Sequence, residues 1–92
     1  MPAVEVARHL YRFFPQLEGQ TLRVEGATAG DVVRAMNALA PGFSDYVLDE
    51  RGRLRMHVNV FIDREAVVDR AGLTDPVPPG ATLFVFQALS GG

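Results

Sequence analysis

The feature that most constrains the fold is the segment at residues 28–40, TAGDVVRAMNALA, whose apolar side chains fall on one side of a helix. Val32, Met36 and Leu39 recur at helical spacing, and polar residues lie between them. A helix with a single apolar stripe is stable only when that stripe packs against another element. The segment therefore requires a sheet on which it can lie.

Both ends of this helix are marked in the sequence. Thr28 has a side chain that can cap the first turn, and Asp31 follows three residues later, where a carboxylate also suits the helix dipole. Pro41 and Gly42 favour an end of the helix directly after Ala40.

The residues before the helix predict a β-hairpin. Residues 3–14, AVEVARHLYRFF, are rich in β-branched and aromatic types, and they predict a first strand that becomes irregular toward its end. A turn around Pro15 and Gly19 follows. Residues 20–25 alternate in polarity, which is typical of a second strand.

The residues after the helix predict an arm and further strands. Residues 46–56, YVLDERGRLRM, indicate a short hairpin that turns at Arg51 and Gly52. Residues 56–63 alternate, and a shorter strand is expected near residues 65–68. The side chains expected to face the core from the first of these strands are Met56, Val58, Val60 and Ile62.

This order of elements, β-β-α-β-β, predicts a fold of the α+β class. We expect one domain with a mixed sheet of four to five strands and one main helix on one face. Residues 1–89 are assigned to this domain, and residues 90–92, Ser-Gly-Gly, to a flexible C-terminal tail.

The last predicted strand, at residues 82–89, separates aliphatic from aromatic side chains. The side chains expected to face the helix are Leu83, Val85 and Leu89, and those on the opposite face are Phe84, Phe86 and Ala88. By the same alternation Phe61 lies on the outer face of its own strand, beside His57 and Asn59.

If these two strands are neighbours, three phenylalanines share a face that a single helix cannot cover. Apolar patches of this kind often mark partner surfaces. The sequence leaves two alternatives open: the N-terminal residues or the arm at residues 43–55 cover the patch, or the alternation has the opposite phase.

Composition excludes several classes of protein. A net charge of −2 and a pI near 5.5 give no basic field for nucleic acid. The chain has no cysteine, which excludes disulfides and thiolate metal sites. No apolar run reaches the length of about 18 residues that a membrane span needs, and residues 1–14 do not resemble a secretory signal, so we expect a cytoplasmic protein.

No catalytic or metal-binding constellation is predicted. The two histidines, His9 and His57, lie on different predicted strands without arranged carboxylates. No pairing of a nucleophile with a base is visible. We expect a chain that binds no metal or cofactor and is not itself an enzyme.

Gly91 and Gly92 end the sequence directly after the last predicted strand. Glycine loses more backbone freedom on ordering than any other residue, so the fold gains nothing from this pair. Glycines suit a backbone that must enter a channel too narrow for a Cβ atom. The only reactive group at such a tip is the carboxylate of Gly92, which becomes reactive when another protein adenylates it with ATP.

These segments together resemble the MoaD/ThiS-type sulfur carriers, a family of ubiquitin-like proteins with the β-grasp fold. The resemblance spans nearly the whole chain. It is carried by the capped helix at residues 28–40, VNVFIDREAV at residues 58–67, PPGATLFVF at residues 78–86 and ALSGG at residues 88–92.

The resemblance implies a role for the tail. An E1-like enzyme that binds MgATP would convert the Gly92 carboxylate to an acyl-adenylate, and a sulfur donor would then displace AMP and leave a thiocarboxylate. A sulfur-accepting synthase would receive the sulfur. The residues assigned to partner binding are Phe61, Phe84, Phe86, Ala88, Leu89 and Ser90, and those assigned to activation and sulfur carriage are Gly91 and Gly92.

The pathway and two other functions stay open. Small subunits of molybdopterin synthase carry proline just before the tail, where this chain has Gln87 and Ala88, so cysteine, thiamin and secondary-metabolite pathways are alternatives. The length and the arm at residues 43–55 resemble the cysteine-synthesis type most.

The chain could instead be a modifier joined through Gly92 to other proteins, or a β-grasp interaction module. All nine basic residues are arginine, so no lysine in the chain can accept an isopeptide bond.

Overall fold

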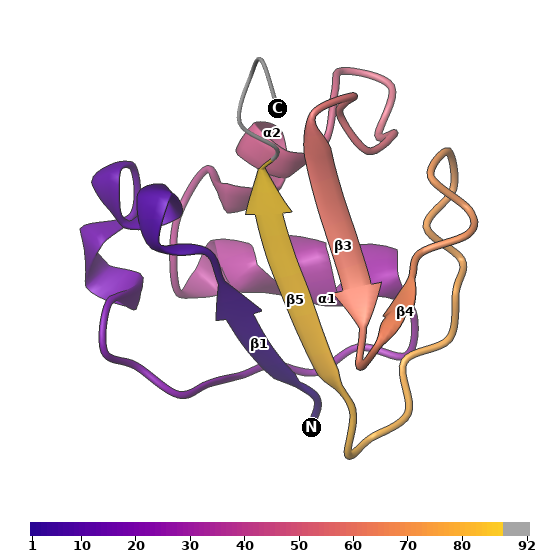
Figure 1. Cartoon of the computed structure of the whole chain (residues 1–92), viewed down its shortest axis with the longest axis horizontal. Helices are drawn as coiled ribbons and strands as arrows, with labels where there is room; N and C mark the ends of the chain where they lie inside the picture. Colours follow the sequence, from indigo (N-terminus) through magenta and orange to yellow (C-terminus); the bar gives the residue numbers. More distant parts are fainter. Residues whose placement is uncertain (88–92) are drawn as a thin grey trace.

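Five strands form one mixed sheet in the computed structural model of the protein, which describes residues 1–87. The strands are β1 (Ala3–Val6), β2 (Leu22–Arg23), β3 (Val58–Ile62), β4 (Glu65–Ala66) and β5 (Thr82–Gln87). They lie in the order β2-β1-β5-β3-β4, and β5 pairs parallel with β1 and antiparallel with β3 (Figure 1). The predicted mixed sheet with one main helix is confirmed.

The main helix, α1 (Ala29–Ala35), crosses one face of the sheet and continues as the short 3-10 helix η3 (Met36–Ala38) (Figure 1). The Thr28 hydroxyl accepts a hydrogen bond from the Asp31 backbone N–H at 3.2 Å, as the capping pattern predicts. A distant loop caps the same end, because the backbone N–H groups of Ala29 and Gly30 donate to the carbonyls of Asp75 and Leu73.

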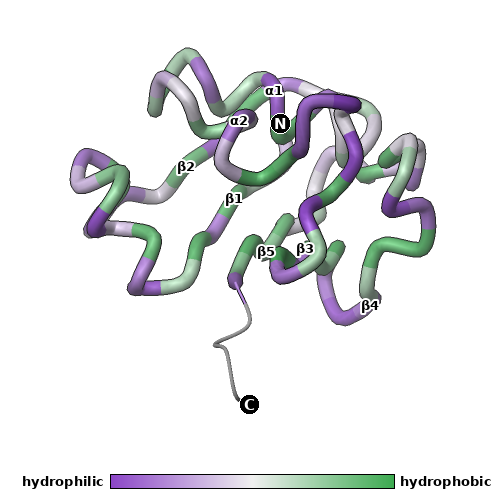
Figure 2. Tube along the Cα trace, turned by 90° about the horizontal axis from the view of Figure 1, so that it is seen from above, coloured by the Kyte–Doolittle hydropathy of each residue, from purple (hydrophilic) through white to green (hydrophobic). Residues whose placement is uncertain are grey.

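The core lies between α1 and the sheet, and Figure 2 shows α1 and a second short helix, α2 (Phe43–Val47), on the same side of β5 and β3. Fully buried side chains come from both layers: Val32, Val33 and Met36 from the helical segment, and Val4, Val60, Leu83 and Val85 from the sheet. Burial of such side chains is the main favourable term in folding. No helix in residues 1–87 is long and apolar enough to cross a membrane.

The predicted helical stripe is wrong at its last position. Leu39 keeps 42% of its surface exposed, and Ala40 is buried instead. The α-helix ends at Ala35 and the more tightly wound η3 follows, which rotates the buried side of the segment by the time the chain reaches Ala40.

The first strand is also shorter than predicted. It ends at Val6, and the chain then forms two 3-10 helices, η1 (Arg8–Arg12) and η2 (Pro15–Leu17). These turns bury Leu10, Phe14 and Leu17, whose spacing is helical. A continuous strand would point Leu10 and Phe14 to one face and Leu17 to the other, so burial of all three side chains favours the turns.

The arm at residues 43–55 turns at Gly52 as predicted, with a backbone φ of +79° and a β-bridge between Leu48 and Leu54. Its first half forms α2, which the sequence analysis missed, although Phe43 and Val47 are four residues apart and both are fully buried. Met56 was expected in the core and is 84% exposed. The reason is that β3 begins only at Val58, so Met56 precedes the alternating segment.

The loop that caps α1 is organised around the carboxylate of Asp69. This carboxylate accepts hydrogen bonds from the hydroxyl of Thr74 at 2.6 Å and from the backbone N–H of Gly72 at 2.9 Å. The Thr74 hydroxyl and then the Gly72 N–H lower the pKa of Asp69 below its ordinary value, because both favour the charged form. The loop also buries Leu73, whose carbonyl accepts from Gly30.

Asp69→Asn tests this arrangement. Because the pKa is lower in the folded protein, the charged carboxylate stabilises the fold above about pH 4, the ordinary pKa of aspartate, and this contribution is lost as the pH falls further. We expect the variant to be less stable near neutral pH and to lose less stability between about pH 4 and pH 2. Urea unfolding across this range measures both effects, and parallel pH profiles for the two proteins would contradict the assignment.

Candidate functional site: the uncovered sheet face and the end of the central strand

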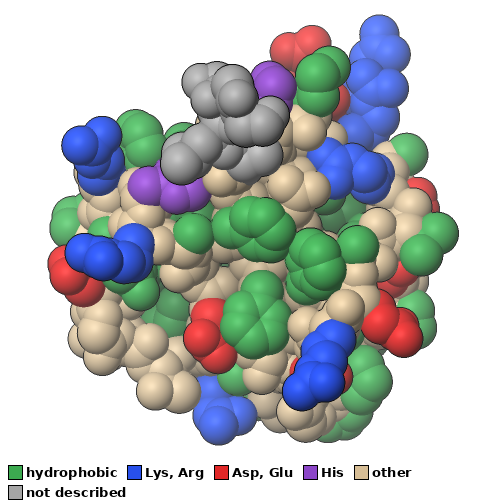
Figure 3. All heavy atoms as spheres, viewed as in Figure 1, with side chains coloured by type: hydrophobic (Ala, Val, Ile, Leu, Met, Phe, Trp, Pro, Cys, Tyr) green, Lys and Arg blue, Asp and Glu red, His purple; other side chains and the backbone are tan. Residues whose placement is uncertain are grey.

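Three phenylalanines lie on the face of the sheet opposite α1. Phe61 on β3 is the register partner of Phe84 on β5, and the rings of Phe61 and Phe86 stack with centroids 5.6 Å apart. Figure 3 views this face and shows hydrophobic side chains gathered in its middle, over β5 and β3. The alternation of side chains along the two strands predicts the same three residues on one face.

The structure decides both alternatives that the sequence left open. Leu83 and Val85 are buried on the helix side of β5, so the alternation has the expected phase. Phe84 retains 36% of its surface exposed, so neither the N-terminal residues nor the arm covers it. Phe61 and Phe86 are half-buried and shield one another in part. The described part of the chain thus presents an aromatic surface that it does not cover itself.

The surroundings of this surface follow from strand pairing. Ala66 on β4 lies next to Phe61, and Glu5 on β1 lies on the far side of Phe84. A single row across the sheet therefore runs from Ala66 through Phe61 and Phe84 to the exposed Glu5. In this row the aromatic side chains are followed by a carboxylate, as at the edge of an apolar interface core with a polar rim.

The carboxyl end of β5 is held by a contact that the sequence analysis missed. Gln87, the last described residue, pairs with Val58 on β3, and its side-chain oxygen accepts a hydrogen bond from the Tyr46 hydroxyl at 2.6 Å. The Tyr46 ring in turn contacts Phe13 and Phe14, with centroids 4.9 Å and 5.8 Å away. No local pattern could have indicated this bond, because its two residues lie 41 positions apart.

The other predicted site residues lie outside the described residues. They are Ala88, Leu89, Ser90, Gly91 and Gly92, together with the predicted boundary between the domain and the tail. Within residues 1–87, no group of three or more histidine, aspartate and glutamate side chains is arranged to hold a metal ion.

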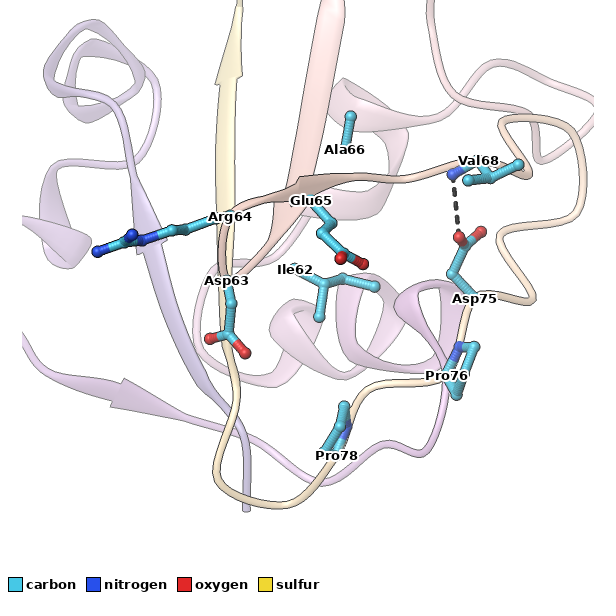
Figure 4. A pocket seen from close by; sticks show the side chains of 9 residues that line it. All are labelled: Ile62, Asp63, Arg64, Glu65, Ala66, Val68, Asp75, Pro76 and Pro78. Carbon is cyan, nitrogen blue, oxygen red and sulfur yellow. Dashed lines mark hydrogen bonds between the residues drawn. The ribbon is translucent and has the colours of Figure 1, made fainter.

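A hollow beside the edge strand β4 is lined by three acidic residues, Asp63, Glu65 and Asp75, and the two aspartates stabilise turns (Figure 4). Asp63 accepts from the backbone N–H of Thr82 at 3.0 Å. Asp75 accepts from the backbone N–H groups of Val68 and Asp69, both at 2.9 Å. Because these carboxylates already receive backbone hydrogen bonds, they account for the shape of the loops around the hollow.

The described residues have the β-grasp, or ubiquitin-like, fold, in which a mixed sheet holds one main helix and the last described strand, β5, is central. No protein-family model matches the chain. Among curated proteins, it is similar to small archaeal modifier protein 3 of Haloferax volcanii, with 29% identity over 93 residues that cover 97% of this chain and 100% of the relative.

Solved structures agree with this class. The Amycolatopsis orientalis BexX/CysO complex contains a chain that matches with a TM-score of 0.83 and 24% identity, and the match covers 100% of both chains. The Mycobacterium tuberculosis CysO structure matches with a TM-score of 0.81 and 25% identity, covering 97% of this chain and 100% of that one. The resemblance to the MoaD/ThiS-type ubiquitin-like sulfur carriers, stated from the sequence, is confirmed.

Adjacent residues on β5 provide a test of the two faces. We expect Leu83→Ala to cost about 3 kcal/mol, because a fully buried leucine leaves a cavity in the core. Phe84→Ala should cost about 1 kcal/mol or less, the range of strand propensities at exposed sheet positions. Urea unfolding of both variants measures the difference. Equal losses would mean that Phe84 serves the fold as Leu83 does, which would argue against a surface reserved for a partner.

Proposed function

We propose that the chain is a sulfur carrier whose glycine Gly92 is activated by an E1-like enzyme and then carries sulfur as a thiocarboxylate. The observation that supports this most is the position of β5. This strand lies between β1 and β3 in the middle of the sheet and carries Phe84 and Phe86 on its uncovered face, and in the sequence only three residues separate it from Gly91 and Gly92. A docking surface on β5 and a reactive carboxylate a few residues later in the sequence suit a protein that other enzymes bind through its folded domain and modify at Gly92.

The proposed chemistry takes place on partners. A carboxylate oxygen of Gly92 attacks the α-phosphate of ATP on the E1-like enzyme, which releases pyrophosphate and forms the acyl-adenylate. Hydrosulfide from a sulfur donor then attacks the acyl carbon and AMP leaves, so that a thiocarboxylate remains. MgATP is bound by the activating enzyme, and the chain itself is a substrate that carries no resident cofactor. ATP and reduced sulfur are both cytoplasmic reagents, so we place the cycle in the cytoplasm.

The surface formed by Phe61, Phe84 and Phe86 is proposed to dock the E1-like enzyme and, in turn, the sulfur-accepting synthase. Full burial of one exposed aromatic side chain contributes roughly 1.5–3 kcal/mol, and since all three rings are already partly buried, docking gains a part of this amount from each of them. Ala88, Leu89 and Ser90 follow β5 in the sequence and precede Gly91 and Gly92, and we assign them to the same interface. The length of the chain and the arm at residues 43–55 favour the cysteine-synthesis type of carrier.

The chemistry can be read from the intact mass of the protein after incubation with MgATP, a sulfide source and an E1-like enzyme from the same organism. We expect a mass gain equal to the replacement of one carboxylate oxygen by sulfur, because the thiocarboxylate differs from the acid only there. Deletion of Gly92 is the control and should abolish the gain. An unchanged mass with an enzyme that activates its other substrates would refute the proposal.

A modifier that becomes joined to other proteins through Gly92 is the second candidate, favoured by the similarity to small archaeal modifier protein 3. It requires the same adenylation, so the two functions differ in what becomes attached to the glycine: sulfur, or an amine of a target protein. Because the chain has no lysine, conjugates would not extend into lysine-linked chains of this protein. An interaction module, by contrast, would retain partner binding after removal of Gly91 and Gly92.

The docking role of the aromatic surface predicts a kinetic effect. Phe84→Ser should raise the KM for the carrier about tenfold in pyrophosphate release by the E1-like enzyme, because an interface ring of this size contributes roughly that factor. The turnover number should change little, since the reacting carboxylate is untouched. Leu39→Ser is a matched control, because Leu39 is 42% exposed and lies in the helical layer. Equal effects of the two substitutions would contradict the docking assignment.

A further inference from the structure

We propose that the hydrogen bond between Tyr46 and Gln87 is a positioning clamp, which holds Gln87, the last described residue, from which the sequence continues to Gly92. The inference rests on the proposed function, because it assigns these two residues to the delivery of the Gly92 carboxylate. Both act through the position of the strand end, and neither touches the reacting atoms.

The end of β5 has backbone pairing on one side only. The parallel ladder with β1 reaches Val85, which pairs with Val6, and does not continue to Phe86 or Gln87. The residues of β5 after Val85 pair with β3 alone, and the last of these pairs joins Gln87 with Val58. A strand end with a single neighbour has less restraint on its direction than one held on both sides. A further contact at Gln87 therefore adds a restraint on the position and direction of this strand end.

Tyr46 is well suited to provide that contact, because α2 is tied to the core. Phe43 and Val47 of this helix are fully buried. The side-chain amide of Asn37 accepts from the Ser44 backbone N–H at 2.9 Å and donates to the Ser44 hydroxyl at 2.7 Å, which joins α2 to the segment that follows α1. Tyr46 thus presents its hydroxyl from a fixed element.

The ring of Tyr46 is also fixed from the other side. Phe13 lies against it at a centroid distance of 4.9 Å, and Phe14 meets it edge-on at 5.8 Å with an interplanar angle of 88°. Aromatic pairs at these distances restrict the orientation of the ring. The hydroxyl is therefore held at the place where the side-chain oxygen of Gln87 can accept from it, at 2.6 Å.

The clamp and the aromatic surface lie on opposite faces of the same strand. Val85 and Gln87 are two residues apart on the helix side of β5, whereas Phe84 and Phe86 point to the uncovered face. A partner can dock on the aromatic surface without contacting the hydroxyl of Tyr46. Loss of the clamp should therefore leave docking intact and lower the fraction of docked complexes in which the carboxylate is aligned for attack.

The test is Tyr46→Phe, which removes the hydroxyl and keeps the ring. In pyrophosphate release by the E1-like enzyme, we expect the turnover number to fall about fivefold, the factor that corresponds to one ordinary hydrogen bond, and the KM for the carrier to stay within about twofold. Tyr11→Phe is the matched control, because Tyr11 is the only other tyrosine and its ring packs against the core. It should leave both kinetic parameters unchanged.

Substitutions of Gln87 distinguish positioning from a general structural role. Gln87→Glu keeps an acceptor for the Tyr46 hydroxyl and should retain the wild-type turnover number, whereas Gln87→Met should match Tyr46→Phe. The double variant Tyr46→Phe/Gln87→Met should be no slower than either single variant, because both remove the same bond. The backbone order parameter of Gln87, measured by NMR relaxation, should fall in Tyr46→Phe and not in Tyr11→Phe.

Two results would overturn the inference in different ways. A Tyr46→Phe variant with a lower order parameter at Gln87 and an unchanged turnover number would show that the bond orders the strand end without serving activation, and the proposed function would stand. A wild-type chain that the E1-like enzyme does not adenylate would refute the proposed function, and the positioning role would fail with it.

Discussion

The rest of the structure depends on the pairing of β5 with two strands from distant parts of the chain. Its ladder to β1 runs from Ala3 with Thr82 to Val6 with Val85, and its ladder to β3 runs from Ile62 with Leu83 to Val58 with Gln87. These ladders place the last strand of the described chain in the middle of the sheet. Within residues 1–87, β5 is thus paired on both sides as far as Val85, and its last two residues, Phe86 and Gln87, pair with β3 alone.

The two faces of β5 differ because α1 covers only one of them. Leu83 and Val85 complete the core under α1, and the loop that contains Leu73 and Asp75 holds the start of α1 through backbone carbonyls. The opposite face keeps Phe84 open to solvent. An aromatic side chain left uncovered on a central strand gives the fold little, so its value is best sought in association with another protein.

In the proposed function, the separation of the two faces of β5 also separates the docking of a partner from the positioning of the Gly92 carboxylate. The aromatic surface offers non-directional apolar contact, which several partners can use in turn. The contact of Tyr46 with Gln87 is directional, short and anchored through Asn37 and Ser44. Because these contacts lie on opposite sides of β5, each can be altered by substitution with little effect on the other. In the proposed function, in which more than one enzyme binds the carrier, this independence would let each partner use the same aromatic surface.

The sequence by itself determined the features that depend on neighbours along the chain. Alternation placed Leu83 and Phe84 on opposite faces, and the Thr28 cap and the turn at Gly52 follow from residues a few positions apart. Only the tertiary structure decided the end of β1, the exposure of Leu39 and Met56, the helix α2 and the bond of Tyr46 with Gln87. The reason is that local patterns fix the preference of a segment, whereas packing against distant segments decides where each element ends and which side chains meet across the core.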